Sequence, residues 1–375
     1  MNHIQGVKKP GSPRILVAPL DWGLGHATRC IPVIYELLNQ NAAVFLAGEG
    51  AQEVLLKKEF PGLPFLHLRG YQVKYGNSRM GLLGTIFRQI PHILRSIRHE
   101  NDWLKNVIKE YEFDAIISDN RYGLYHETVP SVFITHQLAI KSPFGKWNER
   151  ILQKRNYRFI NCFTECWIPD EEKENELAGQ LSHPVIMPAI PVHYLGILSR
   201  LKKLNTEKKK NHLFISLSGP EPQRTFLENK VIHEIGHYEG TATVVRGLPG
   251  EATLIPSTND LQFYNHLPLE ALSKEMQRAD YVISRSGYST VMDIVTLGKR
   301  SILIPTPGQT EQEYLAHYLT EKKIAFCVEQ KDFDLQEALK NASGFDYKNI
   351  NYTVLSQLSS VINTFLTRLS DAQSL

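Results

Sequence analysis

The sequence predicts an α/β protein made of two Rossmann-like domains, each built around a parallel sheet. Short apolar runs alternate with helical patterns along the chain, and the pattern restarts near residue 212. The runs have about four to eight apolar or β-branched residues, as expected for strands buried on both faces. The chain has 375 residues, which fits two domains of roughly 100–200 residues each.

Strands and helices follow one another in both blocks. In the first block we expect strands at residues 14–20, 43–47, 114–118 and 131–135, and a helix at 27–39. In the second block we expect strands at 212–217, 242–245, 281–284 and 301–304, with helices between them. This alternation predicts parallel strands joined by crossover helices that cover the sheet.

The expected domain boundaries follow from this pattern. Residues 199–211 lie between the blocks and are rich in Lys, so we expect a solvated linker, with a basic binding site as the alternative. The expected organisation is a first domain at 1–198, a linker at 199–211, a second domain at 212–350, and a helix at 351–375 that packs back on the first domain. A cleft between two such domains is a common place for a ligand.

Composition excludes several classes of protein. Lys and Arg number 42 against 39 Asp and Glu, and a net charge of +3 is too small for nucleic-acid binding over the whole surface. Cys162 and Cys166 are the only closely spaced pair among four cysteines, and no second pair completes a zinc site. Residues 1–13 lack the apolar stretch of a signal peptide, and no run of about 18 apolar residues exists. We therefore expect reduced thiols and a cytoplasmic protein.

A glycine-containing loop, Asp21 to Arg29 (DWGLGHATR), follows the first expected strand. Glycines let the backbone approach a ligand closely, and the next helix points its free N–H groups at the loop. Thr28 stands where the dinucleotide-binding pattern GxGxxG needs its third glycine, so that kind of site is poorly supported. His26 is our candidate for a general base or a polar sugar contact. The alternative is a helix-start histidine bonded to a neighbouring carbonyl.

Two loops of the second block have the same strand–turn–helix logic. In the segment 216–224 (SLSGPEPQR), Ser218, Gly219 and Arg224 could meet a diphosphate through a hydroxyl, a backbone amide and a guanidinium, unless the segment is only a Pro-rich turn. In the segment 279–290, Ser286 and Gly287 precede a helix and form a candidate anion cradle.

Three acceptor-rich side chains lie further along the second block. Asp293 could accept two hydrogen bonds from a ribose diol, although compensation of the helix dipole is the alternative. Gln312 and Glu313 follow the Pro/Gly turn after the strand at 301–304 and could bond sugar hydroxyls, unless they only cap a helix.

With these motifs in order, the chain resembles the MurG-like glycosyltransferases (glycosyltransferase family 28), most closely over residues 279–326. The resemblance implies the GT-B fold, with two facing domains, a UDP-sugar on the second domain and an acceptor on the first. It implies that Asp293 holds the ribose, that Ser286 and Gly287 hold the phosphates, and that Leu269 borders the base. On the donor side the implied and candidate residues are Gly25, Ser218, Gly219, Arg224, Leu269, Arg285, Ser286, Gly287, Asp293, Gln312 and Glu313. Those expected to contact the acceptor or the sugar are Asp21, His136 and Gln137.

The chain departs from the family pattern at three places. The first loop has fewer glycines before its His, the usual double Gln is Gln312–Glu313, and the usual helix Glu is Asp293. The loop also resembles that of UDP-sugar hydrolases of pseudaminic acid synthesis, which transfer the sugar to water. A hydrolase or epimerase is therefore the main alternative function, and a non-catalytic sugar-nucleotide sensor is a third.

The expected reaction is an inverting, metal-independent displacement that moves a sugar, for which we favour an N-acetylhexosamine, from UDP to a lipid-linked or glycan acceptor. His26 would be the base, and helix N-termini with Arg285 or Arg224 would stabilise the leaving UDP. The Asp332–Asp334 pattern (DFD) resembles a metal-binding motif of another fold, but it begins a helix and is interpreted as a cap. We expect no cofactor and no nucleic-acid partner.

Residues 82–98 form an amphipathic helical pattern. Its apolar positions share one face, and they are Leu83, Ile86, Ile90, Ile93 and Ile97. The opposite face carries basic side chains. The pattern fits a core helix with a basic outer side, or a helix at an anionic membrane surface near a lipid acceptor. Under the second interpretation the protein is peripheral at the inner face of the cell membrane.

Overall fold

The structure is a computed structural model that describes residues 12–71, 79–350 and 356–373. The side chains of residues 79–88, 356, 372 and 373 lie outside this description. The chain divides into two compact units. The first contains Met1–Lys74, Ile86–Arg200 and Thr353–Leu375, and the second contains Tyr75–Thr85 and Leu201–Tyr352.

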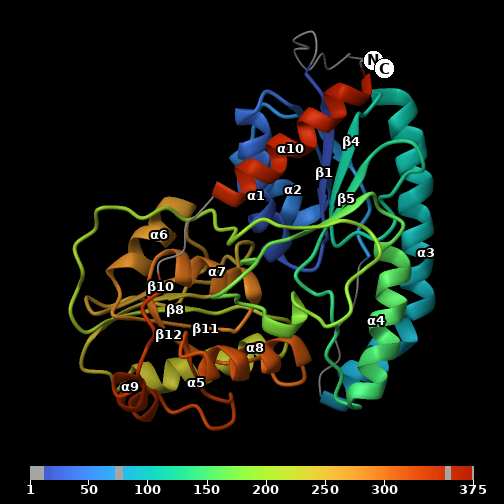
Figure 1. Ribbon diagram of the computed structural model, residues 1–375. Coiled ribbons are helices and arrows are strands. Elements are labelled where there is room, and N and C mark those ends of the chain that lie inside the picture. The colour runs from blue at the N-terminus through green and yellow to red at the C-terminus, as the bar shows by residue number, and fades with distance from the viewer. Residues whose placement is uncertain (1–11, 72–78, 351–355, 374–375) are drawn as a thin grey trace. The chain divides into compact units, whose positions relative to one another are not determined.

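The first unit contains a parallel seven-stranded sheet with the strand order β3-β2-β1-β4-β5-β6-β7. Its strands are β1 (Arg14–Pro19), β2 (Ala43–Gly48), β3 (Phe65–His67), β4 (Ala115–Asp119), β5 (Ser131–Ile134), β6 (Glu165–Ile168) and β7 (Val192–Tyr194). Its helical elements, labelled in part in Figure 1, are α1 (Leu24–Asn39), α2 (Gly50–Glu59), α3 (Arg79–Tyr111, which belongs to this unit from Ile86 on), α4 (Lys146–Ile160), the 3₁₀ helix η1 (Gly179–Leu181) and α10 (Ser356–Gln373).

Side-chain alternation along β1 explains how this sheet is covered. Ile15 to Ala18 are all completely buried. Leu16 and Ala18 point to the face where α3 supplies Leu104 and Val107, so Ile15 and Val17 point to the other face. Helix α1 packs against β1, β2, α2 and α10. The strand is therefore apolar on both faces, as its sequence predicts.

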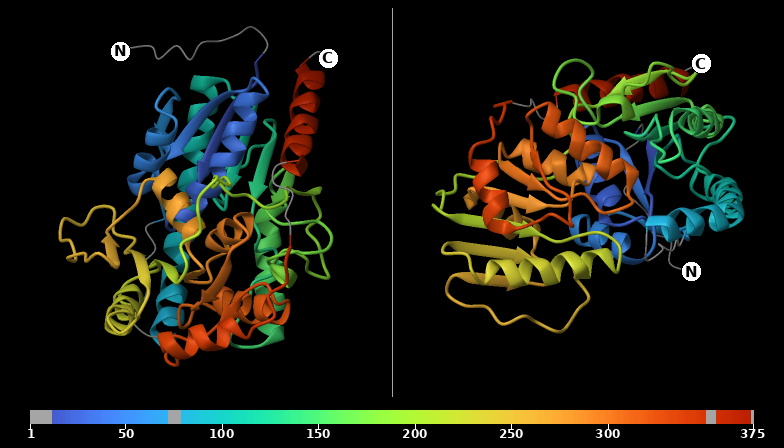
Figure 2. Two further views of the ribbon diagram at one scale, coloured as in Figure 1. Left: turned by 90° about the vertical axis from the view of Figure 1, so that its left-hand side faces the viewer. Right: turned by 90° about the horizontal axis from the view of Figure 1, so that it is seen from below.

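The second unit contains a parallel six-stranded sheet with the order β10-β9-β8-β11-β12-β13. Its strands are β8 (His212–Ser216), β9 (Thr241–Val245), β10 (Leu261–Tyr264), β11 (Tyr281–Ser284), β12 (Arg300–Leu303) and β13 (Phe326–Cys327). Its helices are α5 (Gln223–Ile235), α6 (Leu269–Arg278), α7 (Tyr288–Thr296), α8 (Thr310–Glu321) and α9 (Leu335–Ser343). The prediction of two α/β units with parallel sheets is confirmed, and Figure 2 shows each sheet with its helices from two further sides.

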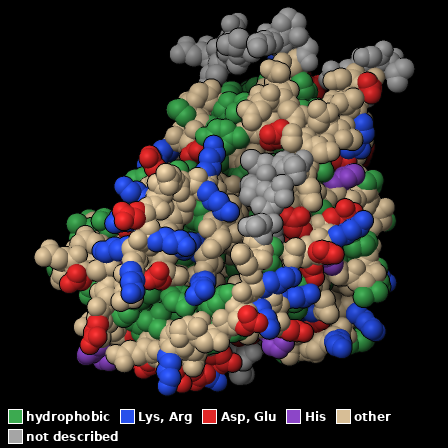
Figure 3. Space-filling model, turned by 60° about the vertical axis from the view of Figure 1, so that its left-hand side comes forward, with side chains coloured by type: hydrophobic (Ala, Val, Ile, Leu, Met, Phe, Trp, Pro, Cys, Tyr) green, Lys and Arg blue, Asp and Glu red, His purple; other side chains and the backbone are tan. Residues whose placement is uncertain are grey.

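The Lys-rich segment that precedes β8 is attached to α6 by hydrogen bonds. The Leu204 amide donates to Gln277 Oε1 (2.7 Å), and the Lys202 carbonyl accepts from Ser273 Oγ (3.2 Å) and Gln277 Nε2 (3.1 Å). Most side chains of residues 202–211 are exposed. On the face shown in Figure 3, Lys and Arg side chains are interspersed with Asp and Glu side chains. The segment is therefore solvated in its side chains but fixed in its backbone.

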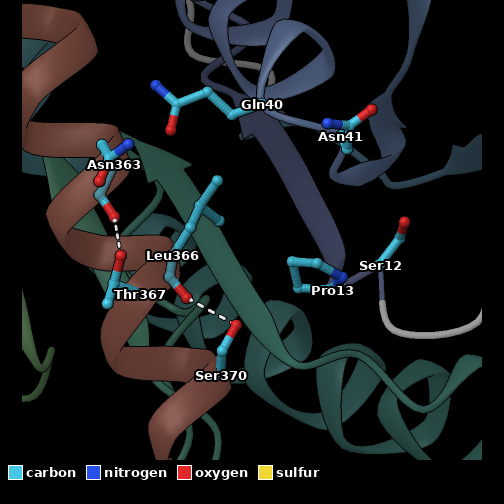
Figure 4. A pocket seen from close by; sticks show the side chains of 8 residues that line it. All are labelled: Ser12, Pro13, Gln40, Asn41, Asn363, Leu366, Thr367 and Ser370. Carbon is cyan, nitrogen blue, oxygen red and sulfur yellow. Dashed lines mark hydrogen bonds between the residues drawn. The ribbon is translucent and has the colours of Figure 1, made fainter.

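Helix α10 packs within the first unit. Its Ser359 donates through Oγ to Glu36 of α1 (2.7 Å), and Phe365 meets Trp167 edge-on with ring centroids 5.4 Å apart. A pocket of about 370 Å³ lies between α10 and the residues next to β1 and α1. Figure 4 shows its polar lining, with Asn41 on one side and Asn363 and Thr367 of α10 on the other.

The amphipathic pattern at 82–98 lies inside the longer helix α3. In its described part, Ile93 and Ile97 pack with Leu20 and Tyr71 of the same unit, so this part of the apolar face belongs to the core. Leu83 and Ile86 lie where side chains are not described. Among the helices of the described ranges, none is long and apolar enough to cross a bilayer.

Candidate active site

Each sheet has one place where the strand order changes direction along the chain. In the first unit this is between β1 and β4, and in the second it is between β8 and β11. Ligands of open α/β sheets bind at the carboxyl ends of the strands that flank such a point. The carboxyl ends of these four strands and the segments that directly follow them contain His26, Asp119, Ser218, Gly219 and Arg285. The topology therefore brings the strongest candidates of each unit to the expected edge of its sheet.

In the first unit, His26 contacts the carboxylate of Asp119, a residue that was not predicted from the sequence as part of the site. Helix α1 begins at Leu24 after Gly23, whose φ of 79° is unfavourable for other residues, so His26 lies in its first turn. The register that pairs Pro19 with Asp119 places the end of β4 beside the end of β1. His26 Nδ1 lies 2.7 Å from Asp119 Oδ1. The same nitrogen also lies 2.9 Å from Arg29 Nη2, so a donor and an acceptor compete for Nδ1. An ionised carboxylate only accepts hydrogen bonds and the Asp119 contact is the shorter of the two, so we assign the proton to Nδ1 and the lone pair to Nε2.

Arg29 and His136 complete this cluster. Both oxygens of the buried Asp119 accept from the Arg29 guanidinium, which is the bidentate geometry of a strong ion pair. Arg29 Nη1 lies 3.1 Å from His136 Nδ1, so that nitrogen accepts and His136 carries its proton on Nε2. The two histidines therefore have opposite tautomers, one with an accepting Nε2 and one with a donating Nε2.

The environment keeps the cluster in this charge state. Burial and the Arg29 guanidinium lower the pKa of His26 from its usual 6.5, although Asp119 opposes them. Burial alone would raise the pKa of Asp119, but Arg29 and His26 outweigh it and hold that pKa well below its usual range. At neutral pH the cluster therefore contains an ionised Asp119 and a neutral His26, which can take up a proton.

The other candidates of the first unit have structural contacts. The Asp21 carboxylate accepts from the Tyr71 amide (2.9 Å) and lies against Gly70, where a Cβ would clash with it. The Gly25 carbonyl accepts from Thr28 Oγ1 (2.9 Å) in the first turn of α1. The Gln137 carbonyl accepts from Asn156 Nδ2 (3.0 Å). These residues shape the loops around His26, and their contact with a substrate stays a prediction.

In the second unit, Gly219 and Arg285 meet at the expected edge of the sheet. Ser218 and Gly219 are exposed after β8, and Gly219 has a φ of 109° that strongly favours glycine. A Cβ placed on Gly219 would lie 3.5 Å from Thr306 Oγ1 and 3.8 Å from Arg285 Nε. Among the described residues, neither of those two buried atoms has a hydrogen-bond partner. Such atoms are costly to leave unsatisfied, by about 1–3 kcal/mol each, and they mark a place for a ligand acceptor.

Arg285 carries a buried charge that contacts no carboxylate of the described residues. Its guanidinium donates to the carbonyls of Ile304 (3.3 Å), Pro305 (3.2 Å) and Gln223 (2.8 Å). Burial lowers the pKa of Arg285 to about 10, so it remains a cation at neutral pH. A buried cation held only by neutral dipoles is suited to an incoming anion.

Arg224 has carboxylate partners instead. Its Nε lies 2.5 Å from Glu221 Oε1, and its Nη1 lies 3.2 Å from Glu228 Oε2. Since those contacts already neutralise its charge, the geometry favours Arg285 over Arg224 as the cation for a leaving group. A role of Arg224 in donor binding stays a prediction.

Ser286 and Gln312 connect two loops at the same edge of this sheet. The Ser286 hydroxyl donates to the Gln312 carbonyl (2.9 Å), and Gln312 Oε1 accepts from the Thr306 amide (2.9 Å). Gly287 caps α7, and the space where its Cβ would stand is open. The N-terminus of α7 thus lies beside a turn fixed by hydrogen bonds, where the positive end of the helix dipole favours an anion.

Glu313 borders a pocket in the second unit. One of its oxygens accepts from the Gly308 amide (2.9 Å). The pocket has a volume of about 760 Å³ and lies at the carboxyl ends of β12 and β13. Asp293 is half-buried on α7, and Leu269 is half-buried at the start of α6. A sugar-sized ligand fits the pocket, while the predicted roles of Asp293 and Leu269 remain untested.

The acidic DFD pattern is a helix cap. Asp334 Oδ1 accepts from the Glu337 amide (2.8 Å) at the start of α9, which confirms the interpretation drawn from the sequence. Within the described residues, no group of three or more His, Cys, Asp or Glu side chains is placed to hold a metal ion.

The second unit, which contains these loops, matches a known protein family. Residues 202–354 match the glycosyltransferase family 28 C-terminal domain, which covers nearly all of the second unit. The second unit is a glycosyltransferase family 28 C-terminal domain. The match contains every donor-side candidate from Ser218 to Glu313.

Relatives extend the similarity to most of the chain. The UDP-N-acetylglucosamine--N-acetylmuramyl-(pentapeptide) pyrophosphoryl-undecaprenol N-acetylglucosamine transferase of Haemophilus ducreyi is 24% identical over 328 residues, covering 84% of this chain and 85% of its own. The transferase of the same name from Actinobacillus pleuropneumoniae is 23% identical over the same length. With the family 28 domain, these relatives indicate that the chain is a UDP-sugar glycosyltransferase that resembles the MurG-like enzymes.

Solved structures show the same architecture. The glycotransferase of kitacinnamycin matches with a TM-score of 0.64 and 14% identity, covering 97% of this chain and 96% of its own. The spinosyn rhamnosyltransferase SpnG matches with a TM-score of 0.61 and 14% identity, covering 96% and 95%. At such identities the likeness concerns the fold, and the predicted GT-B fold is confirmed.

Proposed function

We propose that this glycosyltransferase moves a sugar from a UDP-sugar to a lipid-linked or glycan acceptor, with inversion and without a metal. The observation that carries the proposal is the His26–Asp119 contact, which leaves an accepting Nε2 on a neutral histidine at the carboxyl edge of the first sheet. A nearby proton acceptor is what a hydroxyl nucleophile needs to attack an activated sugar.

The proposed reaction is one displacement at the anomeric carbon. His26 Nε2 takes the proton of the acceptor hydroxyl while its oxygen bonds to the anomeric carbon on the face opposite the diphosphate. The bond from that carbon to the diphosphate oxygen breaks, and UDP leaves with the electron pair. Arg285, Thr306 Oγ1 and the amides at the start of α7 are suited to stabilise the charge of the leaving group.

The names of the relatives supply the proposed substrate classes. They specify UDP-N-acetylglucosamine as donor and a pyrophosphoryl-undecaprenol saccharide as acceptor. We propose an N-acetylhexosamine donor that binds the second unit, and an acceptor that binds the first. The domain limits at 198, 212 and 350, the cleft between the domains and the position at the inner face of the membrane remain parts of this proposal.

Incubation with a panel of UDP-sugars, with and without lipid-linked saccharides, tests the proposal. Release of UDP only when an acceptor is present, with an inverted product by NMR and full activity in EDTA, is the expected result. Free sugar without acceptor would indicate the hydrolase, an altered UDP-sugar the epimerase, and binding without turnover a sensor. Loss of activity in EDTA, restored by Mg²⁺ or Mn²⁺, would contradict the metal-independent scheme. The relatives reported above are transferases and give the hydrolase alternative no support.

We expect the acid limb of the kcat/KM profile to lie below pH 6.5. The base must be neutral, and burial with Arg29 lowers the pKa of His26 from 6.5. The rate should therefore be retained as the pH falls through 6.5 and should be lost only as the pH passes the lowered pKa. A profile measured with saturating donor, against the stability of the protein over the same range, checks this expectation. A limb above pH 6.5 would contradict the assignment of His26 as the base.

Gly219→Ala should weaken donor binding while leaving the first unit unchanged. The φ of 109° at this position is strained for alanine, so the loop beside Arg285 and Thr306 has to shift. We expect the UDP Kd, measured by calorimetry, to rise roughly tenfold for a loss of about 1–2 kcal/mol. Gly250→Ala is the matched control, because Gly250 has open space and no positive φ. Equal UDP binding by both variants would show that the loop does not contact the donor.

A further inference from the structure

A buried ion pair that the proposed mechanism does not use lies next to the candidate site of the first unit. Glu100 of α3 is 1% exposed, and Arg121, which follows β4, is completely buried. Arg121 Nε donates to Glu100 Oε1 (2.7 Å). Arg121 comes only two positions after Asp119, the carboxylate that contacts His26. The pair is therefore placed to control the end of β4.

The Arg121 guanidinium connects three parts of the first unit. Besides its bond to α3, its Nη2 donates to the Arg69 carbonyl (2.6 Å), and its Nη1 donates to the Pro19 carbonyl (3.5 Å). Arg69 follows β3, and Pro19 is the last residue of β1, where it pairs in register with Asp119. One side chain therefore fixes the carboxyl edge of the sheet around β1 and β4 against α3.

The backbone around Asp119 depends on the position of Arg121. The Arg121 amide donates to Ser118 Oγ (3.2 Å), and that hydroxyl donates to the Arg121 carbonyl (2.6 Å). Asn120, between Asp119 and Arg121, has a φ of 56°, in the left-handed region that Asn adopts more readily than most residues. Because the turn is tight and bonded at both ends, a shift of Arg121 would also move the Asp119 carboxylate.

Glu100 extends this network to the loop that contains the proposed base. Its Oε2 accepts from Tyr71 Oη (2.7 Å). The Tyr71 amide donates to Asp21 Oδ1 (2.9 Å), and Asp21 is the first residue of the loop that contains His26. The network therefore reaches the loop of the proposed base as well as the end of β4.

Close packing joins the segment after β4 to α3. The Gly123 amide donates to Glu100 Oε2 (3.0 Å). A Cβ on Gly123 would lie 2.2 Å from the Ile97 carbonyl oxygen and 2.6 Å from Glu100 Cβ, so only glycine fits. The two backbones are therefore in direct contact, and a displacement of one is transmitted to the other.

Stability alone does not explain why the pair is charged. Burial raises the pKa of Glu100 to about 7, although Arg121 and the hydrogen bonds from Tyr71 and Gly123 act against it. Ionised Glu100 is therefore less favourable in the fold than in water. Buried ion pairs can often be replaced by apolar residues without loss of stability, so a positioning role is the more economical explanation of the charges.

We propose that the Glu100–Arg121 pair positions the site, by holding the Asp119 carboxylate against His26 Nδ1 so that Nε2 stays in its accepting form. The pair acts through the backbone of residues 118–121 and through the loop that begins at Asp21. Its expected effect on the rate rests on the proposed function, whereas its effect on the tautomer of His26 does not.

Nitrogen NMR of the His26 ring in the full, substrate-free chain tests the pair directly, with His26→Ala to identify the signals. In wild type we expect the proton on Nδ1. In Glu100→Gln an NH2 group faces one of the donors of the network, so the network should loosen. The share of the Nδ1–H tautomer should fall, and the pKa of His26 should fall further, because the Asp119 contact raises it. We expect kcat to fall by roughly 10- to 100-fold and the Kd for UDP to stay within about twofold.

Tyr71→Phe is a milder second variant, because it removes only the hydroxyl that donates to Glu100. It should shift the His26 signals in the same direction and reduce kcat by a smaller factor. Glu165→Gln is the matched control. Glu165 is also 1% exposed and paired with an arginine, Arg368 (2.6 Å), but it lies on β6, which β5 separates from β4. This control should lower stability without changing the His26 signals or kcat.

The outcomes distinguish this proposal from the proposed function. His26 signals like those of wild type in folded Glu100→Gln or Tyr71→Phe would overturn the positioning role. An equal shift of those signals in Glu165→Gln would also overturn it, because the effect would then be a general loosening of the unit. Shifted signals with an unchanged kcat would support the positioning role and would instead contradict His26 as the base.

Discussion

His26→Ala should reduce kcat by roughly 100- to 10,000-fold, because it removes the proposed proton acceptor of the reaction. The Kd for UDP should stay within about twofold of wild type, since the proposed donor contacts lie in the second unit, around Gly219 and Arg285. Single-turnover rates and calorimetry with UDP measure the two effects separately.

His67→Ala is the matched control for this variant. His67 also lies in the first unit, but its side chain is 74% exposed and distant in sequence from the cluster. Its removal should leave both kcat and UDP affinity unchanged. If His26→Ala lost rate and UDP affinity to the same extent, His26 would be a structural residue and not the base.

Asp119→Asn should reduce kcat nearly as much as His26→Ala does, although Asp119 is a positioning residue that acts through His26. The charge of Asp119 fixes Nδ1–H and stabilises the imidazolium that forms in the transition state. We expect kcat to fall by roughly 100- to 10,000-fold. Because Asp119 raises the pKa of His26, the acid limb of the residual activity should move to lower pH.

The double variant Arg29→Gln/Asp119→Asn separates positioning from stability. Asp119→Asn alone leaves the buried Arg29 guanidinium without its counter-charge, which should cost about 3–5 kcal/mol in the free energy of unfolding. Removing both charges should recover most of that stability, because a buried ion pair is often neutral relative to uncharged residues. Activity should not recover. Recovery of both together would mean that Asp119 only supports folding.

The sequence was sufficient to predict most of the inner strands but not the strands at the edges of the sheets. Strands β1, β4, β5, β8 and β11 lie between neighbours, are largely buried and appear as continuous apolar runs. The edge strands β3, β7, β10 and β13 are partly exposed, so their segments carry mixed polar and apolar residues without a clear pattern. The inner strand β6 was also missed, because it starts with the buried Glu165, which pairs with Arg368.

The residues of the candidate site could also be predicted only in part. His26 could be singled out because a glycine loop and a helix start surround it within a few residues. Asp119 contacts His26 across 93 positions of the chain, and only the pairing of β1 with β4 brings them together. The sequence feature that could have pointed to Asp119 is an acidic residue directly after a buried strand. No sequence feature pointed to Thr306, because its proposed role depends on the buried Arg285 guanidinium beside it.

Glu313 stands where the MurG-like glycosyltransferases usually have the second Gln of a pair. Its carboxylate also supports the local backbone. Its oxygen supports the turn at Gly308 by accepting an amide proton, and a Gln side chain has an oxygen at the same position. Glu313→Gln would therefore preserve the turn while removing one negative charge from the rim of the pocket. Any change in sugar preference in that variant would report the lost charge and the exchange of an accepting oxygen for a donating NH2 group, so this position is suited to re-engineering donor choice.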